Sequence, residues 1–161
     1  MSDELLDSIK KRGASIAHVT LHVGIDTFAP VRVDNLSSHK MHGEKIEITK
    51  GVADEINRVK SEGGRIIAIG TTTTRTLESM ATKDRESWIV NSGQKTTDLF
   101  ITPGYKFKIV DAMLTNFHQP KSTLIVLVSA FAGREFILSC YEEAIREKYR
   151  LFSFGDCMLI L

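Results

Sequence analysis

Polar side chains gather between two apolar segments within residues 110–135, VDAMLTNFHQPKSTLIVLVSAFAGRE. Pro120 pushes the residue before it toward extended geometry, so the polar cluster lies on a turn with limited freedom. Ser122 or Thr123 can cap the helix that follows. The N-terminus of a helix offers unpaired N–H groups and a positive dipole end, which favour a phosphate or carboxylate ligand. The segment therefore predicts one wall of a ligand site, with polar residues Asp111, Thr115, Asn116, His118, Lys121, Ser129 and Arg134.

The residue types in this segment suit proton transfer on a sugar. A histidine beside an amide and a hydroxyl can accept or donate a proton while its neighbours hold substrate oxygens. The alternative is structural: Thr115 and Asn116 bond the turn backbone, and His118 is a surface residue. The residues alone leave both interpretations open.

A second candidate segment, GTTTTRTLES, directly follows the apolar run RIIAIG. The order of strand, glycine, hydroxyl-rich turn and helix presents backbone N–H groups to an anionic or ribosyl ligand at the carboxyl end of a sheet. The segment matches neither GxGxxG nor a P-loop, so it predicts no dinucleotide or ATP site. Alternatively, Thr71 and Thr72 cap the helix while Arg75 and Glu78 pair at the surface.

A third segment, LHVGIDTFAPVRVDNLSSHKMHGE, is dense in titratable groups. Such density is typical of acid and base catalysis or of metal binding. Metal is the weaker interpretation, because the segment contains no HxxxH or CxxC ligand pair. The structural alternative is a solvated loop that carries His39 and His42, with His22 as a satisfied strand histidine. The titratable residues are His22, Asp26, Arg32, Asp34, His39, His42 and Glu44.

The sequence shows no conventional nucleophile, since it has no GxSxG elbow and neither cysteine lies near a histidine in a recognised motif. Covalent catalysis is therefore not predicted. The tail, KYRLFSFGDCMLIL, carries Tyr149, Arg150 and Phe152, a mixture that could stack on a base and hold a hydroxyl. We expect Phe152 to belong to the core, as aromatic side chains usually do.

The order of predicted elements is that of an α/β protein. Helix, glycine turn, buried strand and helix follow one another over residues 51–81, with RIIAIG as a strand buried in a parallel sheet. We predict one α/β domain over residues 1–161, with a three-layer, Rossmann-like arrangement around a mixed or parallel sheet. Helices are predicted from Asp3 to Gly13 and at 51–62, 71–81, 122–131 and 134–148, and strands at 15–23, 31–33, 45–49, 65–70, 100–101, 107–110, 113–114 and 155–161.

Composition narrows the protein class. The chain has 161 residues, of which 42% are hydrophobic and 25% charged, which fits a globular domain and argues against disorder. Lys and Arg total 21 against 20 Asp and Glu, so no overall basic excess indicates nucleic acid, although a local basic face remains open. Cys140 and Cys157 have no ligand-like spacing, and no secretory signal precedes them, which favours reduced thiols and a cytoplasmic protein. The longest apolar run, residues 124–132, is too short to span a bilayer, so no membrane segment is expected.

Six blocks of the chain, taken together, resemble a known family. They are HVTLHVGIDTFAPVRVDN, HKMHGE, IAIGTTTTRTLES, LFITPGYKFKIVDAMLTNFHQPKSTL, LVSAFAGRE and YRLFSFGDCMLI. In this order, and over nearly the whole chain, they resemble the S-adenosylmethionine:tRNA ribosyltransferase-isomerases of queuosine biosynthesis. Six ordered blocks are far more specific than any one short motif.

The resemblance implies transfer of the ribosyl part of S-adenosylmethionine to 7-aminomethyl-7-deazaguanine (preQ1) at the wobble position of tRNAs with a GUN anticodon. Isomerisation of the sugar then gives epoxyqueuosine and releases adenine and methionine. S-adenosylmethionine is a substrate, and neither a cofactor nor a metal is implied. The chemistry needs a base for a proton beside the sulfonium, an acid for departing adenine, and donors for the ribose hydroxyls.

Carried onto this chain, the resemblance gives three sets of candidate residues. Proton transfer is assigned to His118, Asp111 and Glu44, with His22 as a positioning residue. S-adenosylmethionine is held by Gly70, Thr71, Thr72, Arg75, Asn116 and Arg134. The anticodon loop contacts the basic residues Arg32, His39, Lys40 and Lys121.

The chain also departs from the family pattern. The part of the family fold that would come first, including an inserted β-barrel, has no counterpart here, so a separate N-terminal half is a possible partner. Asp26 stands where the family usually has glycine, and Gln119 where it usually has leucine. A side chain in place of glycine can distort a turn or block a ligand. The alternative to an active or complementable enzyme is thus a noncatalytic fragment that keeps at most ligand or partner binding.

Overall fold

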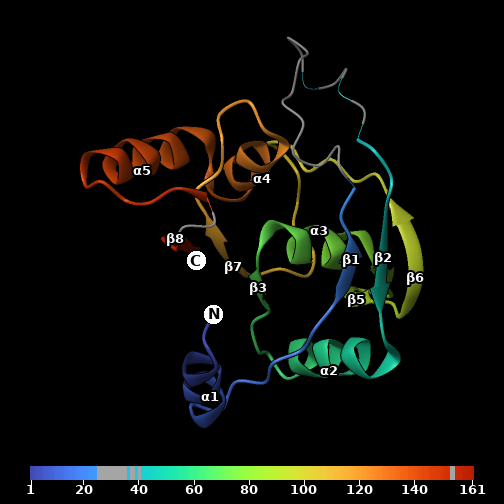
Figure 1. Ribbon diagram of the computed structural model, residues 1–161. Coiled ribbons are helices and arrows are strands. Elements are labelled where there is room, and N and C mark those ends of the chain that lie inside the picture. The colour runs from blue at the N-terminus through green and yellow to red at the C-terminus, as the bar shows by residue number, and fades with distance from the viewer. Residues whose placement is uncertain (25–35, 37–38, 40, 153–154) are drawn as a thin grey trace.

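The computed structural model describes residues 1–24, 36, 39, 41–152 and 155–161 (Figure 1). The predicted strand at 31–33 and the candidate residues Asp26, Arg32, Asp34 and Lys40 lie outside the described residues. The elements follow in the order α1 (Asp3–Lys11), β1 (Thr20–His22), β2 (Glu44–Ile48), α2 (Lys50–Ser61), β3 (Ile67–Ile69), α3 (Thr71–Ser79), β4 (Ala81–Asp84), β5 (Ser87–Val90), β6 (Gly93–Thr97), β7 (Ala112–Asn116), α4 (Thr123–Ala132), α5 (Arg134–Arg146) and β8 (Cys157–Ile160).

The described strands form three small sheets. One is antiparallel, in the order β1-β2-β6, and the hairpin β4-β5 is a second. The third has the order β3-β7-β8, in which β3 and β7 are parallel and β7 and β8 antiparallel. The predicted α/β class with mixed pairing is therefore confirmed, because helices alternate with strands and both kinds of pairing occur in one sheet.

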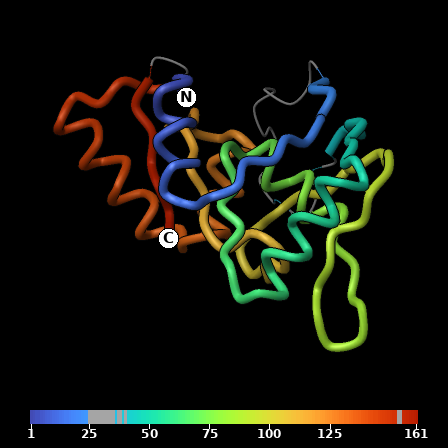
Figure 2. The backbone as a smooth tube through the Cα atoms, turned by 90° about the horizontal axis from the view of Figure 1, so that it is seen from below, coloured from blue at the N-terminus to red at the C-terminus, as the bar shows by residue number. Residues whose placement is uncertain are grey.

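Two apolar cores lie between these sheets and the helices. The first joins β2 and α2 to α3 and the hairpin through buried side chains such as Ile46, Ile56 and Leu77. The second joins β7 and β8 to α4 and α5 through Met113 and Ile137, among others. Figure 1 shows α4 and α5 on one side of β7, and the tube in Figure 2 shows the β4-β5 hairpin extending away from the rest of the chain.

Helix boundaries follow from local capping. Ser2 caps α1 by accepting the Leu5 N–H, and Thr49 caps α2 by accepting the Val52 N–H. Gly70 precedes α3 with φ +91°, a left-handed conformation that glycine adopts without strain. Such local signals explain why the predicted helices match the observed ones to within a few residues.

The strand predictions hold less well. The predicted strands at 100–101 and 107–110 are irregular, and β4, β5 and β6 were not predicted. The Lys108, Ile109 and Val110 N–H groups donate to the Glu78 carboxylate, so they are satisfied without a strand partner. The predicted strand at 15–23 is reduced to β1, because only its last residues pair with β2.

Two burial predictions are wrong. In β3, Ala68 is fully buried, but Ile67 and Ile69 are 49% and 45% exposed. The strand therefore has one open face instead of the two buried faces expected in a parallel sheet. Phe152, expected in the core, is 37% exposed.

No single helix in the described part of the chain is long and apolar enough to cross a membrane. The helices α4 and α5 reach that length and apolarity only as a pair, and they are bent by 114° relative to each other.

Candidate functional site

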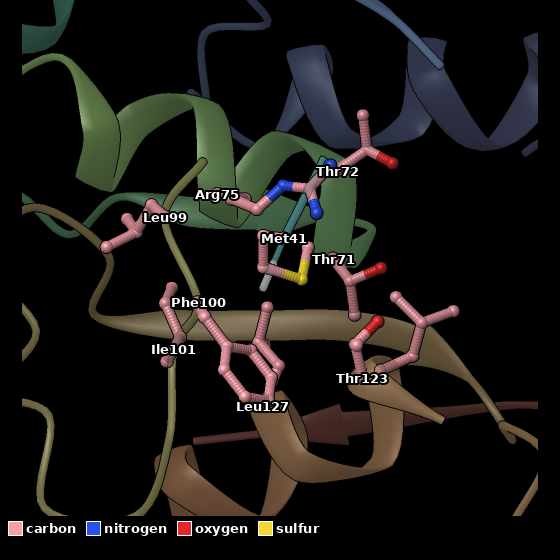
Figure 3. Close-up of a pocket in the computed structure, with 10 residues that line it drawn as sticks. Met41, Thr71, Thr72, Arg75, Leu99, Phe100, Ile101, Thr123 and Leu127 are labelled. Atoms are coloured by element: carbon pink, nitrogen blue, oxygen red, sulfur yellow. The ribbon is translucent and has the colours of Figure 1, made fainter. Parts of the chain in front are cut away.

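Two helices begin at the same pocket. α3 follows the parallel strand β3, and α4 follows the neighbouring strand β7 after a short turn. Because parallel strands end at the same edge of a sheet, both helix N-termini lie at that edge. The pocket encloses about 320 Å³ of empty space, part of which is open to solvent. Its lining residues are Met41, Thr71, Thr72, Arg75, Leu99, Phe100, Ile101, Thr123, Leu124 and Leu127 (Figure 3).

A buried ion pair lies beside the pocket. The Arg75 guanidinium, on α3, contacts the Glu44 carboxylate at the start of β2, and the two side chains are 7% and 3% exposed. Glu44 Oε1 also accepts the Gly24 N–H at 3.2 Å. Arg75 Nε has no hydrogen-bond partner among the described residues, although it is buried. The Arg75 side chain is thus held in place while part of its hydrogen-bonding capacity stays open.

A second buried polar atom lies at the start of α4. Ser122 caps this helix, since its Oγ accepts the Ile125 N–H at 3.3 Å. Because Ser122 caps the helix, the neighbouring Thr123 hydroxyl is not used for capping. This hydroxyl is buried, since Thr123 is only 7% exposed, and it has no hydrogen-bond partner among the described residues. In Figure 3 this hydroxyl points from α4 toward Thr71, and the Arg75 guanidinium extends toward the same space. An unpaired buried hydroxyl costs free energy, which a ligand acceptor could recover.

His118 lies at the same edge of the sheet, in the turn between β7 and α4. Its Nε2 is 2.9 Å from Thr115 Oγ1, and its backbone N–H donates to the Tyr141 hydroxyl at 2.7 Å. Burial lowers the pKa of His118 to about 4, so the imidazole is neutral at neutral pH. A neutral imidazole with a fixed orientation can act as a general base.

The family model described as "Queuosine biosynthesis protein" matches residues 1–160. The chain belongs to this family. Curated relatives named S-adenosylmethionine:tRNA ribosyltransferase-isomerase include proteins from Natranaerobius thermophilus (53% identical over 98% of this chain), Syntrophotalea carbinolica (52% over 99%) and Francisella philomiragia subsp. philomiragia (54% over 99%).

A solved structure supports the same assignment. The crystal structure of S-adenosylmethionine tRNA ribosyltransferase from Thermotoga maritima is 42% identical, with a TM-score of 0.77, over 99% of this chain. The match covers 50% of that structure's chain and 45% to 46% of the three curated relatives. The chain thus spans about half the length of the family members that it matches.

The structure brings together four of the family-derived candidates. Thr71, Thr72 and Arg75 line the pocket, and Glu44 contacts Arg75. Gly70 lies next to them, with its N–H donating to the Leu114 carbonyl at 2.7 Å. The alternative in which Arg75 pairs with Glu78 at the surface is wrong, because Arg75 is buried against Glu44.

Asp111 is separated from this group. It precedes β7, whereas His118 follows it, so the two lie at opposite ends of a strand that spans roughly 16 Å at about 3.3 Å per residue. Asp111 Oδ2 accepts the Ile66 N–H at 2.8 Å, and Lys60 Nζ is 3.4 Å from the carboxylate. These contacts connect the starts of β3 and β7 and leave Asp111 outside the pocket.

Three other candidates are exposed and do not line the pocket. Asn116 is the last residue of β7. Side chains alternate along a strand, so the Asn116 side chain lies on the opposite face from that of Thr115, the residue that contacts His118. Arg134 is the first residue of α5, and His22 ends β1, where it pairs in register with Lys45. The structure therefore does not bring these three side chains to the two helix N-termini.

Two of the basic residues proposed to contact RNA lie in the described part of the chain. The His39 ring contacts Phe100, with centroids 5.1 Å apart, so His39 borders the pocket. Lys121 is exposed in the turn before α4 and has φ +57°. Arg32 and Lys40 lie outside the described residues.

Sequence reasoning missed several residues that shape the site. Phe100 lines the pocket, Tyr141 fixes the backbone of His118, and the Thr123 hydroxyl is unpaired. Glu78 anchors residues 108–110, and the Tyr105 hydroxyl donates to it at 3.0 Å. Burial, followed by the charge of Glu78, raises the pKa of Tyr105. For Thr123, the sequence offers one signal, its position directly after Ser122 at the predicted helix start. No motif distinguishes Phe100, Tyr141 or Glu78.

Among the described residues, no group of three or more His, Cys, Asp or Glu side chains is arranged to hold a metal ion.

Proposed function

We propose that this chain supplies the S-adenosylmethionine-binding part of a tRNA ribosyltransferase-isomerase. In the proposed reaction, the ribosyl moiety of S-adenosylmethionine moves to preQ1 at the wobble position of a tRNA with a GUN anticodon and is isomerised to epoxyqueuosine. Adenine and methionine are released. The observation that carries the proposal is the pocket at which α3 and α4 both begin, in a chain whose relatives bear this activity in their names.

The pocket offers complementary surfaces for the two ends of S-adenosylmethionine. The N–H groups at the starts of α3 and α4 and the Thr123 hydroxyl suit the methionyl carboxylate or the ribose oxygens. Phe100, Leu99 and Leu127 form an apolar wall that suits the adenine ring. We propose that Gly70, Thr71, Thr72 and Arg75 hold S-adenosylmethionine directly. Asn116 and Arg134, which do not line the pocket, would contact only the parts of the substrate that extend out of it.

Proton transfer is assigned to two groups near the sheet edge. A proton on the carbon beside the sulfonium is acidic, and the imidazole of His118, oriented by Thr115, can remove it, so we propose His118 as the base; burial lowers the pKa of His118 and therefore its strength as a base. Glu44, whose carboxylate contacts Arg75, is the second candidate. We propose a structural role for Asp111, given its contacts with Ile66 and Lys60. His22 remains a proposed positioning residue.

For the tRNA, we propose that His39 and Lys121 contact the anticodon loop from the two sides of the pocket, together with Arg32 and Lys40. Splayed bases and phosphates of a loop are the features that proteins recognise in single-stranded RNA. Replacing one of these basic side chains by a neutral one is expected to weaken tRNA binding for all sequences alike and to reduce the salt dependence of binding.

The chain spans only about half the length of its relatives, so we propose that the part of the family fold outside the match is needed to complete the enzyme. The second candidate function is a noncatalytic fragment that binds a ligand or partner without turnover. The exposed side chains of β3 favour it, because they show a sheet that lacks part of its covering layer.

Isothermal titration of the chain with S-adenosylmethionine tests the pocket assignment. We expect binding that Arg75→Met weakens and that Phe136→Ala, a change at an exposed residue of α5, leaves unchanged. Titration with methionine and with adenosine separates the polar and apolar ends of the pocket. The assignment would be contradicted if Arg75→Met bound each of the three ligands with the same affinity as the wild type.

A further inference from the structure

The peptide unit between Phe117 and His118 is held on both of its polar sides. Its N–H, which belongs to His118, donates to the Tyr141 hydroxyl at 2.7 Å. Its carbonyl, which belongs to Phe117, accepts the Phe152 N–H at 3.2 Å. The two partners come from α5 and from the segment before β8. Because the peptide unit is planar, it cannot rotate without breaking one of these two hydrogen bonds.

The Tyr141 hydroxyl is placed by the packing of its ring. The ring contacts that of Phe117 edge to face, with centroids 5.3 Å apart, and Phe117 is only 3% exposed. Aromatic pairs in this arrangement are stabilised beyond the area that they bury. Burial raises the pKa of Tyr141, so the side chain stays a neutral phenol at neutral pH. The acceptor of the His118 N–H is thus a fixed, uncharged hydroxyl.

Phe152 contributes its backbone and not its side chain. The side chain is 37% exposed, and φ is +60°, a conformation that bulky residues rarely adopt. An ion pair holds the two flanks of Phe152 together, with Arg150 Nη2 3.1 Å from Asp156 Oδ1. Backbone strain of this kind persists only where the surrounding contacts maintain it. The conformation that brings the Phe152 N–H to the Phe117 carbonyl is therefore held from both sides.

The held peptide unit bears directly on the imidazole, because the Cα atom of His118 belongs to it. His118 Nε2 lies 2.9 Å from Oγ1 of Thr115, which is 4% exposed. In the tautomer whose Nε2–H donates to Thr115, Nδ1 is the nitrogen that is free to accept a proton. A base must lie within hydrogen-bond reach of its proton, and a misplacement of about 1 Å can lower a rate about 100-fold.

We propose that Tyr141 is a positioning residue for His118 and acts, together with the Phe152 N–H, through the peptide unit that they both hold. This inference rests on the proposed function, in which His118 is the base. Tyr141 does not line the pocket, so its effect reaches the substrate only through His118. Helix α5 and the segment before β8 thereby contribute to the reaction without contacting the substrate.

Tyr141→Phe tests the proposal, because it removes the hydroxyl and keeps the ring against Phe117. NMR of the full chain follows the His118 amide and the C2–H signals of the five histidines. We expect hydrogen exchange of the His118 amide to become about tenfold faster or more. The pKa of His118 should rise by about one unit from its value of about 4, because the loosened imidazole gains access to water.

Tyr149→Phe is the matched control. Tyr149 also packs edge to face on Phe117, with centroids 5.8 Å apart, but it is 50% exposed and its hydroxyl has no hydrogen bond with the described residues. This variant should leave both His118 readouts unchanged. Arg150→Met tests the carbonyl side, since it removes the ion pair that flanks Phe152. It should speed exchange of the Phe152 amide and move the pKa of His118 in the same direction, by a smaller amount.

Activity gives a second readout in the enzyme completed with the rest of the Natranaerobius thermophilus relative. Tyr141→Phe should lower kcat for adenine release about tenfold and leave the KM for S-adenosylmethionine unchanged, because only the base is displaced.

Three results would overturn the inference. They are an unchanged amide exchange rate and pKa of His118 in Tyr141→Phe, equal changes in Tyr149→Phe, and a rise in KM in place of the fall in kcat. Absence of adenine release from every protein, the wild type included, would contradict the proposed function. The NMR comparison would still decide whether Tyr141 positions His118, so the two failures are distinguishable.

Discussion

Arg75 and Glu44 form an ion pair in the interior, between α3 and β2, with side chains 7% and 3% exposed. Removing two charges from water is costly, and attraction between them offsets that cost only when the pair is well placed. Glu44 receives an additional N–H from Gly24, whereas Arg75 Nε has no partner among the described residues. The pair thus fixes one wall of the pocket.

Breaking this pair should destabilise the protein. Arg75→Met leaves a buried carboxylate without its cation and is expected to lower the free energy of unfolding by about 3–5 kcal/mol, as measured in urea. The double variant Arg75→Met, Glu44→Met should lose less than the sum of the single changes. Arg58→Met removes exposed ion pairs on α2 and should change stability little. Additive losses in the double variant would argue against a coupled pair.

Replacing Thr123 separates ligand binding from stability. Thr123→Val removes a hydroxyl that has no partner among the described residues, so the midpoint of urea unfolding should stay the same or rise slightly. If the hydroxyl binds the substrate, the Kd for S-adenosylmethionine should rise about tenfold or more. Thr123→Ser, which keeps the hydroxyl, is the control. An unchanged Kd in Thr123→Val would remove this residue from the site.

His118 predicts an acid-sensitive stability. Its pKa falls from 6.5 to about 4 on folding, so the unfolded chain binds a proton there first as the pH drops. Stability should therefore decrease between about pH 6.5 and pH 4, by about 3 kcal/mol from this group, with no contribution above that window. His118→Gln should reduce the slope of unfolding free energy against pH in that range. The control is His18→Gln, at an exposed position, which should leave the slope unchanged. The same slope in the wild type, His118→Gln and His18→Gln would contradict the burial of His118.

Glu78 should matter for folding and not for substrate binding. Its carboxylate accepts N–H groups of Lys108, Ile109 and Val110 and the Tyr105 hydroxyl. Glu78→Gln replaces an acceptor-only group with one that carries two donors, so we expect a loss of about 2–4 kcal/mol in unfolding free energy. Glu86→Gln, at an exposed position, should have little effect. A large change in the S-adenosylmethionine Kd of folded Glu78→Gln would show that Glu78 does more than anchor the loop.

The elements that sequence predicts well here are those specified by neighbouring residues. Helices α2 to α5 have local caps or glycine starts, and the apolar run of β3 is evident from the residues alone. The polar strand β6 depends on β2, a partner distant in sequence, and residues 108–110 depend on Glu78, whereas the hairpin β4-β5 is local and was still missed. The six blocks identify the family, and the turns at Gly70 and Ser122 identify two walls of the pocket.

Contacts across the fold could not be predicted from local pattern. Arg75 and Glu44 are far apart in sequence, and the separation of Asp111 from His118 follows from the length and direction of β7. The exposure of Ile67 and Ile69 depends on which other layers are present, a property of tertiary packing that an apolar run does not encode.

Release of adenine from S-adenosylmethionine in the presence of preQ1-containing tRNA tests the central claim most directly. The chain is mixed with the complementary half of the Natranaerobius thermophilus relative, with the full-length relative as the positive control. The account predicts that adenine appears only when both polypeptides are present, and that His118→Gln reduces its rate more than Asp111→Asn does. Assembly of the two polypeptides, shown by their co-purification, with no adenine from any combination would contradict it.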